Sequence, residues 1–452
     1  TYVPRVHTIR TTSLTFMVFA IPLVIAESCA YLGMILFVFN LWKDDPIEIS
    51  TPPTRLHDIA PDHPEGDRPL SVDIMFATYN EDPDLVRLGI QDSKKISYPH
   101  AIDIRIHVLD DGRRADMRAV AEAEGVNYIA RTTNEGFKAG NLRHAMEQTA
   151  GDLLIICDAD TRPFPTILEN TLGYFKDPRM AWVQTPQWFY DLPEGEPLDV
   201  VLSRRLGKAG AAAGRAIQKF AGPIQLGADP FVSDPKMFYD IIQRRRNWAN
   251  ASFCCGAGSI HRREAVMEAA LRSFGAKVET RAHATEEFIT VSSKERQIAP
   301  DLLQAIRTEA ATTEILTPYR FHVSEDIYTS IVLHSDRERG WKSKMHPIVE
   351  SKMLSPQDLL TWTVQRYKYA GGSLDILIHD NPLFRRGLTF PQRMMYATTF
   401  YSYLAPIWNL IFLIAPVVYL FTGISPVTAY SATFFWHLIP FLVTLELAMM
   451  AG

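Results

Sequence analysis

The sequence predicts an α/β domain, built on a Rossmann-like, mostly parallel sheet and inserted between transmembrane α-helices. Three observations indicate this fold class. Short apolar segments alternate with helical segments through residues 71–184. Acidic residues follow successive apolar segments. Long, nearly uncharged stretches lie near both ends of the 452-residue chain. Alternating strands and helices at this spacing are typical of a parallel sheet that has helices on both faces.

The elements of the predicted sheet follow one another closely. Each strand is a run of apolar residues, and each helix carries apolar residues at helical spacing between turn residues. Ligands bind such sheets at the carboxyl ends of the strands. In chain order we predict strands at 72–77, 102–109, 127–130, 153–157 and 180–184, with helices at 84–95, 115–123, 138–148 and 165–175.

Three apolar stretches, 14–42, 394–421 and 428–450, are long enough to cross a bilayer, which needs about 20 residues. The first is too long for a signal peptide and lacks a small-residue cleavage site. Basic residues lie close to the ends of these stretches, which favours a cytosolic middle domain. Four cysteines in the whole chain also fit a reducing compartment. The basic residues are Lys43, Arg385, Arg386 and Arg393.

The resulting division has five parts. Prolines mark a linker between the first apolar stretch and the sheet. The net charge of −5 provides no basic surplus to neutralise phosphates, so we expect no nucleic-acid partner. The predicted parts are an N-terminal transmembrane segment (1–49), the linker (50–70), the α/β domain (71–350), interfacial amphipathic helices (351–393) and C-terminal transmembrane helices (394–452).

Acidic residues cluster where three predicted strands end. Asp158 and Asp160 follow one strand, Asp110 and Asp111 another, and Glu81 a third. Carboxylates gathered at one sheet edge repel one another unless a cation lies between them. Magnesium or manganese suits such oxygen ligands and is often held by one or two carboxylates plus substrate phosphates. The alternative is helix capping, because aspartate favours the N-cap position.

Further polar residues lie near predicted helix starts. Lys138 begins a helix, where a lysine and backbone amides can bind a diphosphate, although a solvated lysine is an equal alternative. Glu325 and Asp326 follow Ser324 in a pattern that capping alone explains. The segment 360–372 mixes cations with aromatics. It is typical of an interfacial helix or of a site where rings stack on sugars.

These motifs together resemble the processive family 2 glycosyltransferases, and most closely the catalytic subunits of bacterial cellulose synthases. The likeness extends from about residue 14 to the end of the chain. The motifs that carry it are Tyr79-Asn80-Glu81, Asp110-Asp111-Gly112, KAGN at 138–141, DAD at 158–160, VQTP at 183–186, FCCG at 253–256, SED at 324–326, Gln365-Arg366 and NPLFRRG at 381–387.

The resemblance implies a GT-A fold and an inverting, UDP-sugar-dependent enzyme in the bacterial inner membrane. The implied reaction polymerises glucose from UDP-glucose into a β-glucan, most simply a β-1,4-linked one, and passes it across the membrane. Mg²⁺ or Mn²⁺ is the implied cofactor, and membrane lipids and a periplasmic accessory subunit are implied partners. Curdlan-type β-1,3-glucan, a mixed-linkage glucan and a non-processive transfer to a lipid carrier are alternatives.

The resemblance also implies a role for each residue that matches a family motif. Asp326 is similar to the general base, and Asp160 to the principal metal ligand, while Asp158 is similar to a residue that meets both metal and nucleotide. Residues of the donor side are Tyr79, Glu81, Asp111 and Lys138. Gln365, Arg366 and Lys368 match the motif that holds both the pyrophosphate and the acceptor sugar. Other substrate-binding residues near the acceptor are Phe253, Cys255, Gly256, Glu325 and Tyr369.

Two departures from the family pattern affect the acceptor side. Lys368 and Tyr369 stand where the family motif has arginine and tryptophan. Lysine keeps the charge but loses the two-pronged hydrogen bonding of arginine. The charged stretch 270–318 is longer than cellulose synthases usually have before the base, and we expect a surface helix or a mobile lid there.

Overall fold

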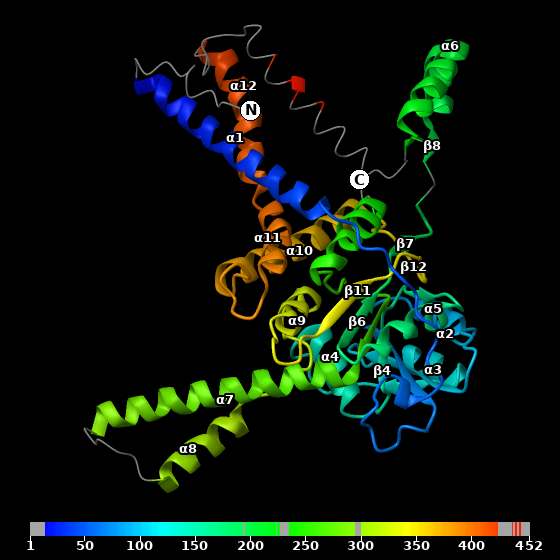
Figure 1. Cartoon of the computed structure of the whole chain (residues 1–452), viewed down its shortest axis with the longest axis vertical. Coiled ribbons are helices and arrows are strands. Elements are labelled where there is room, and N and C mark those ends of the chain that lie inside the picture. Colours follow the sequence, from blue (N-terminus) through cyan, green and yellow to red (C-terminus); the bar gives the residue numbers. More distant parts are fainter. Residues whose placement is uncertain are drawn as a thin grey trace.

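In the computed structural model, a seven-stranded sheet forms the centre of the large domain (Figure 1). The structure describes residues 14–192, 195–222, 224–226, 235–293 and 300–423, with isolated positions at 436, 439, 440 and 443. The sheet has the order β11-β6-β10-β4-β1-β2-β3. Its strands are β1 (Leu70–Thr78), β2 (Ile102–Asp110), β3 (Asn127–Ile129), β4 (Leu153–Asp158), β6 (Met180–Gln184), β10 (Ser259–Arg262) and β11 (Lys342–Met345).

The predicted parallel sheet is confirmed, and all five predicted strands are present. Only β10 runs against its neighbours, since it pairs antiparallel with both β4 and β6. The helices that cover the sheet also lie where the alternation predicts them. They are α2 (Pro83–Ser93), α3 (Ala115–Ala123), α4 (Phe137–Met146) and α5 (Ile167–Thr171), which continues as η3 (Leu172–Lys176).

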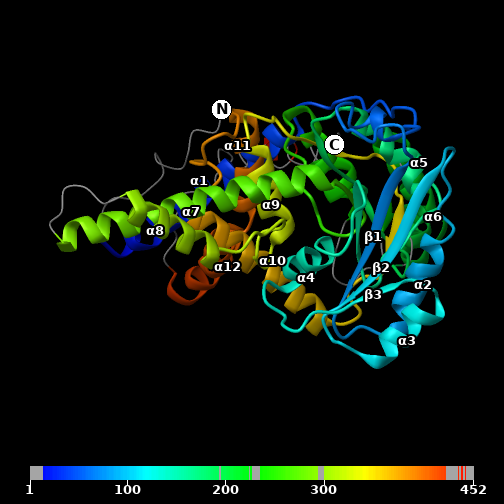
Figure 2. The same cartoon turned by 90° about the horizontal axis from the view of Figure 1, so that it is seen from below.

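Apolar side chains are buried on both faces of the sheet. Helices α2 and α3 lie on one face and α4 on the other (Figure 2). Val72 and Ile74 of β1 belong to the apolar cluster that includes residues of α2 and α3, whereas Met75 belongs to the cluster that includes residues of α4. Burial on both faces explains why β4 and β6 are continuous apolar runs, whereas the first half of β2, which is partly exposed, alternates apolar with polar residues.

A second sheet joins segments that lie far apart in the chain. It has the order β5-β12-β7, with β5 at Arg162–Pro163, β12 at Ser351–Met353 and β7 at Gln187–Phe189. Residues 351–353, assigned above to the interfacial segment, therefore form a strand beside the main domain. In the segment 50–70, Leu56 and Ile59 are buried in the core, so this segment is packed against the sheet.

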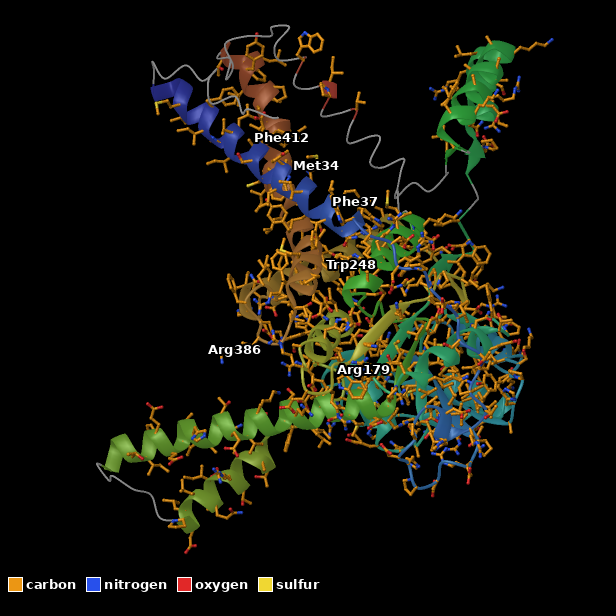
Figure 3. The ribbon with its side chains drawn as sticks, in the orientation of Figure 1. Met34, Phe37, Arg179, Trp248, Arg386 and Phe412 are labelled. Atoms are coloured by element: carbon orange, nitrogen blue, oxygen red, sulfur yellow. The ribbon has the colours of Figure 1, made fainter. Side chains whose placement is uncertain are left out.

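Two described helices are long and apolar enough to cross a membrane: Met17–Leu41 in α1 (Leu14–Leu41), and α12 (Ala405–Thr422). The side chains of Met34, Phe37 and Phe412 lie along these helices (Figure 3). The predicted stretch 394–421 holds one candidate span, α12, but the predicted extent is too long, because its first part belongs to a separate helix, α11 (Phe390–Ser402). A proline in the first turn of α12 favours this break. The predicted span 428–450 lies outside the described residues, apart from isolated positions.

The stretch 270–318 lies mostly in two surface helices, α7 (Arg263–Ser293) and α8 (Pro300–Thr313), which extend away from the sheet (Figure 1). They pack on each other through a small cluster that includes Ala282, Ile306 and Ala310. A surface helix was one of the two expectations for this stretch. Another projecting helix, α6 (Leu198–Ala221), is flanked by the short strands β8 (Glu196–Pro197) and β9 (Gln225–Leu226).

Polar contacts fasten α1 to the domain. Arg246, in η5 (Arg244–Ala249), is buried and donates through Nε to Oδ1 of Asn40 at 2.9 Å. Asn40 in turn donates to the carbonyl of Ile242 at 3.2 Å. Burial lowers the pKa of Arg246 to about 10, so the side chain stays charged at neutral pH. The long apolar helix α1 and the α/β domain are thus linked by a specific buried contact.

Candidate active site

The site lies where β4 and its neighbours end, as expected for a parallel sheet. Asp158 is the last residue of β4, and its carboxylate forms an ion pair with Lys138 at the start of α4. Asp160 lies in the following turn, where its Oδ2 accepts a hydrogen bond from the backbone N–H of Leu354 at 3.1 Å. Two carboxylates and one lysine therefore meet at this edge.

Glu325 and Asp326 reach the same place from the first turn of α9 (Glu325–His334). A Cβ built on Gly256 would lie 3.7 Å from both Oδ2 of Asp326 and Nζ of Lys138. Asp326 accepts from the N–H of Ile327 at 2.8 Å through its Oδ1. Four separate segments thus contribute residues that surround one point. These segments are the end of β4, the start of α4, the start of α9 and the loop before β10.

Burial and mutual repulsion shape the charge state of these acids. Burial, followed by the charge of Asp158, raises the pKa of Asp160 to about 6. Burial, followed by the charge of Asp326, raises the pKa of Glu325 to about 8, and burial also raises that of Asp326. For Lys138, burial acts to lower the pKa, but the charges of Asp158 and Glu325 outweigh it and the pKa is raised. The site therefore holds more negative charge than its lysine balances.

The three residues expected to hold the nucleoside lie on neighbouring turns of the same edge. Tyr79 is exposed. Glu81 braces the turn after β1, where its Oε2 accepts from the hydroxyl of Thr78 and the N–H of Tyr79, both at 2.8 Å. Asp111 is buried and forms a two-pronged ion pair with Arg131, at 2.6 and 2.7 Å. Asp111 is therefore close to the site but is already bound to a cation.

The FCCG segment forms a wall held from two sides. Gln184 at the end of β6 accepts from the N–H of Cys255 at 2.7 Å, and the N–H of Cys254 donates to Ser330 of α9 at 2.9 Å. Phe253 stacks on Tyr396 of α11, with ring centroids 6.4 Å apart. The wall thus connects the sheet, helix α9 and a helix next to α1.

Helix α10 (Leu359–His379) carries Gln365, Arg366, Lys368 and Tyr369. A Cβ on Gly372 would lie 2.1 Å from Oγ and 3.0 Å from Cβ of Ser324, so Ser324 or α10 would have to shift where α10 crosses the start of α9. Tyr369 is 45% exposed. Burial, then the charges of Asp326 and Asp158, raise the pKa of its hydroxyl, so the hydroxyl lies within electrostatic reach of the acidic cluster. Arg366 lies over the ring of Trp362 at 5.6 Å and, like Lys368, is exposed.

Residues 73–269 match the family described as glycosyl transferase family 2. This stretch contains β1, β4 and the FCCG wall. Residues 73–269 form a family 2 glycosyltransferase domain.

Curated relatives of the chain are cellulose synthases. Cellulose synthase 1 of Komagataeibacter xylinus is 30% identical over 378 residues, which is 83% of this chain and 20% of that protein. The cellulose synthase catalytic subunit (UDP-forming) of Pseudomonas fluorescens (strain SBW25) is 29% identical over 377 residues, or 82% of this chain and 40% of that protein. The chain therefore spans a fifth to two fifths of the length of these relatives.

The fold also matches a solved glycosyltransferase structure. The mannosyltransferase PcManGT from Pyrobaculum calidifontis, solved with GDP-Man and Mn²⁺, superposes with a TM-score of 0.54 and 14% identity. The superposition covers 96% of this chain and 92% of that chain. The predicted GT-A fold is thereby confirmed.

The glycosyltransferase domain has carboxylate ligands that fit a divalent cation. Among the described residues, no group of three or more histidine, cysteine, aspartate or glutamate side chains forms a metal site of its own. Asp158 and Asp160 supply two carboxylates, and the charge of Asp158 already raises the pKa of Asp160. This fits magnesium or manganese, which bind few carboxylates when phosphate oxygens complete the coordination.

Several residues that shape the domain's site were not predicted from the sequence. Arg131 holds Asp111, and Tyr239 of η4 (Met237–Gln243) is buried near Cys255 and Tyr369. A small cavity beneath Asp326 is also lined by His261 and Tyr319. For Arg131, the sequence offered one signal: it follows β3, and that strand ends at the same edge of the sheet as the site.

Proposed function

We propose that this protein is a membrane-embedded, processive and inverting glycosyltransferase that polymerises glucose from UDP-glucose into a cellulose-like β-1,4-glucan. The observation that carries the proposal is the position of Asp326, which lies beside Lys138 and under α10, in a domain fastened to an apolar helix. Relatives that are about 30% identical and named cellulose synthases support the choice of polymer.

The donor would bind across the carboxyl ends of β1, β2 and β4. Tyr79 offers an exposed ring for the base, with Glu81 and Asp111 beside it. Lys138, which meets Asp158 in the structure, would turn to the diphosphate, where a lysine and helix-start amides stabilise negative charge. The diphosphate adds further negative charge beside the acidic cluster, so the donor would need a divalent cation between its phosphates and the carboxylates.

Asp158 and Asp160 would hold Mg²⁺ or Mn²⁺ together with the donor phosphates. When bound, this cation offsets the charge that develops on the departing UDP. Asp160 would stay oriented through its hydrogen bond from Leu354, which leaves its other carboxylate oxygen available.

Asp326 would act as the general base. Its carboxylate takes the proton of the acceptor hydroxyl while that oxygen attacks the anomeric carbon of glucose, and the bond from this carbon to the UDP oxygen breaks. Attack from the face opposite the leaving group inverts the carbon, so the α-linked donor gives a β-linkage. A positioned general base typically contributes about 10²–10⁴-fold to the rate.

The acceptor end of the glucan would lie between the FCCG wall and α10. Cys255, Gly256 and Tyr369 would contact the acceptor directly. Phe253, which is buried against Tyr396, would support this wall from behind, and Glu325 would approach from the start of α9. Gln365, Arg366 and Lys368 would contact the donor phosphates or the acceptor sugar from above. Lys368 provides charge without the geometry of arginine, so the phosphate contact depends more on Arg366.

The location proposed is the bacterial inner membrane, with the catalytic domain in the cytosol. Helices α1 and α12 would cross the bilayer with further helices, in contact with lipids, and guide the polymer outward. A periplasmic accessory subunit that receives the polymer is part of this proposal.

The proposal is tested by incubating the purified full chain with UDP-glucose and Mg²⁺, then digesting the product with linkage-specific glucanases. We expect an insoluble polymer that a β-1,4-glucanase degrades. Degradation by a β-1,3-glucanase would identify a curdlan-type enzyme, and degradation by both a mixed-linkage one. Product extracted into organic solvent would identify transfer to a lipid carrier. If no glucose is incorporated, UDP-glucose is not the donor.

A further inference from the structure

The projecting helix α6 is a hairpin. Gly207 has a φ of 57° and interrupts the helix, so the chain turns back on itself there. Beyond the turn, the two arms lie very close together, because a Cβ on Gly210 would be 2.2 Å from the carbonyl oxygen of Leu202 and one on Gly214 would be 2.4 Å from Cα of Asp199. Glycines at these positions let the arms touch and leave the outer faces free.

The outer arm separates apolar from basic side chains. An apolar stripe follows positions i, i+4, i+7, i+8 and i+11, and all five residues are exposed. Phe220, at the end of the stripe, is 93% exposed. The basic residues Lys208, Arg215 and Lys219 recur at i, i+7 and i+11, along one flank of the stripe. The stripe consists of Ala209, Ala213, Ala216, Ile217 and Phe220.

The hairpin is strongly basic and packs mainly on its own strands, β8 and β9. Residues 195–222 contain five basic side chains and two acidic ones, Glu196 and Asp199. Both acids already have basic partners, since Glu196 meets Arg204 at 2.6 Å and Asp199 meets Arg215 at 3.8 Å. The hairpin projects on the same side of the catalytic domain as α1 and α12 (Figure 1).

We propose that the α6 hairpin binds the surface of the membrane, with its apolar stripe in the bilayer interface and its basic flank on anionic lipid headgroups. A helix with Lys and Arg beside a stripe containing Phe is typical of interfacial helices. Each basic side chain near an anionic surface strengthens such binding by roughly fivefold. The excess of basic charge favours anionic lipid over a second copy of this basic hairpin.

This binding would steady the active site. Asp191, shortly before β8, accepts from the N–H and hydroxyl of Ser355 at 2.9 and 2.8 Å, and from Gln357 at 2.7 Å. The neighbouring residue Leu354 holds Asp160. A hairpin fixed on the membrane would therefore restrain the loop that orients Asp160 and leads into α10. This proposal rests on the membrane placement of α1 and α12 proposed above.

The test uses the full chain in nanodiscs, with a nitroxide attached at Phe220→Cys. Electron paramagnetic resonance spectra measure how often the nitroxide collides with oxygen, which concentrates in lipid, and with a water-soluble nickel chelate. We expect oxygen collisions to rise several-fold over nickel collisions when the discs contain anionic lipid in place of purely zwitterionic lipid. Lys208→Gln with Lys219→Gln should remove this difference. Labelled wild-type protein corrects for the native cysteines.

Two matched probes separate the possible outcomes. Phe288→Cys, on exposed α7, should remain aqueous in both discs. Leu413→Cys, exposed on α12, should show the lipid signature in both. The inference is overturned if the Phe220 probe behaves like the Phe288 probe, or if it is shielded from both reagents, as in a protein contact. An aqueous Leu413 probe would instead refute the membrane placement in the proposed function.

Discussion

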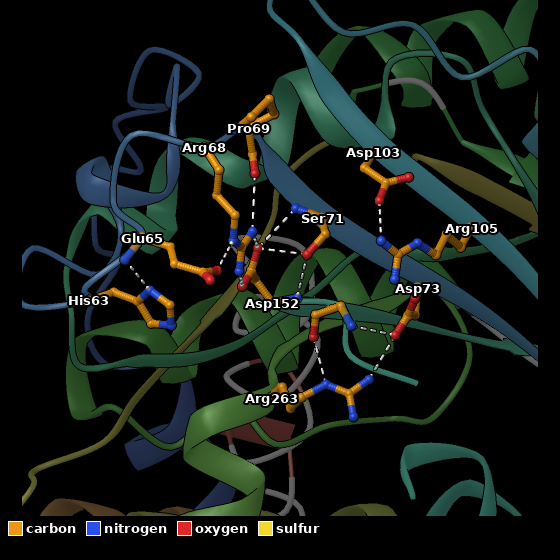
Figure 4. Close-up of polar contacts among 11 residues, drawn as sticks. His63, Glu65, Arg68, Pro69, Ser71, Asp73, Asp103, Arg105, Asp152 and Arg263 are labelled. Carbon is orange, nitrogen blue, oxygen red and sulfur yellow. Dashed lines mark hydrogen bonds and ion pairs between the residues drawn. The ribbon is translucent and has the colours of Figure 1, made fainter. Parts of the chain in front are cut away.

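Two acids near the amino ends of the central strands, Asp152 and Asp73, have surroundings opposite to those of Asp160 and Asp326 in the proposed site. At the amino ends of β1 and β4, Asp152 is paired with Arg68 at 2.6 Å, and Asp73 with Arg263 at 2.7 Å (Figure 4). Burial raises the pKa of both acids, but their partners outweigh it and the pKa is lowered: hydrogen bonds with His107 and the N–H of Gly151, then Arg263, act on Asp73, and Arg68 and Ser71 act on Asp152. At the carboxyl ends, Asp160 and Asp326 have raised pKa values. Paired acids stabilise the fold, whereas the crowded ones form the proposed site.

The role of Asp326 as base gives the first prediction. Asp326→Asn keeps the shape of the side chain but removes its capacity to take a proton, so turnover should fall by about 10²–10⁴-fold. UDP binding should be nearly unchanged, because the nucleoside residues are on other turns. Rates of polymer formation and calorimetric titration with UDP check the two parts. Asp116→Asn, on the exposed face of α3, is the control. A variant that makes polymer at the normal rate would show that the base lies elsewhere.

The pKa of Glu325 predicts how stability depends on pH. Its folded pKa of about 8 is higher than the unfolded value of about 4.3, so the folded protein binds a proton that the unfolded chain releases between these pH values. Stability should therefore fall as pH rises from about 5 to 8. Glu325→Gln removes this titration, and its melting temperature should depend less on pH over that range. Thermal unfolding of ligand-free protein measures the slopes, with Glu287→Gln on the exposed face of α7 as the control. Equal slopes in all three proteins would contradict the assignment.

The metal prediction concerns Asp160. Removing divalent cations with a chelator should stop synthesis, and adding Mg²⁺ or Mn²⁺ back should restore it. Asp160→Asn loses a ligand charge, so the Mg²⁺ concentration for half-maximal activity should rise by at least the roughly 10- to 100-fold seen when outer-shell partners of metal sites are lost. Activity measured against Mg²⁺ concentration checks this. Full activity in excess chelator would reject a metal role for Asp160.

At the scale of elements, the crossing of α10 over α9 decides whether the proposed acceptor side forms. Gly371 and Gly372 are a matched pair in α10, because a Cβ at Gly371 meets nothing within 4 Å whereas one at Gly372 meets Ser324. Gly372→Ala should displace α10 and lower the polymerisation rate by on the order of tenfold or more, since misplacement by about 1 Å can cost 10²-fold. Gly371→Ala gains the same helix propensity and should retain activity. Equal rates in the two variants would show that this crossing does not govern catalysis.

The sequence predicted the elements that carry a local pattern. Apolar runs followed by turn residues located β1, β2, β4 and β6, and helix α3 has the predicted bounds. Strands β10 and β11 were not predicted, because each has four residues and its pairing comes from distant segments. An apolar run alone also could not show that α11 and α12 are separate helices.

The same limit applies to the site. Motif residues at strand ends could be predicted to meet, since parallel strands end at one edge. The pairing of Arg131 with Asp111 could not be predicted, because it depends on where the loop before α4 turns. The approach of Tyr239 likewise depends on packing between segments that lie far apart in the chain. Motifs identify residues that share a place, but they do not identify the partners that set the charge there.

At the scale of the whole molecule, the catalytic domain is joined to α1 by side chains and not only by the connecting segment. Asn40 near the end of α1 accepts from buried Arg246, whose guanidinium also lies 5.2 Å from the ring of Phe253 in the FCCG wall. Tyr401 of α11 donates to the carbonyl of Cys29 at 2.9 Å. The wall, α11 and α1 are therefore a continuous packed unit, which lines up the proposed site with the proposed membrane helices.

The α7–α8 hairpin is outside that unit, and its removal provides the last prediction. Its small apolar cluster is separate from the main core, while the start of α7 contributes Ala265 and Val266 to the domain. The base of the hairpin is narrow, since Nζ of Lys277 lies 3.9 Å from Oε2 of Glu314. Replacing residues 278–313 by a short Gly-Ser loop should therefore leave the melting temperature and UDP binding close to those of the full chain. The rate of polymer formation should stay within about twofold of that of the full chain, which corresponds to a change of less than about 1 kcal/mol in the activation free energy. If the shortened protein binds UDP normally but no longer makes polymer, the hairpin takes part in handling the acceptor and is not merely a surface extension.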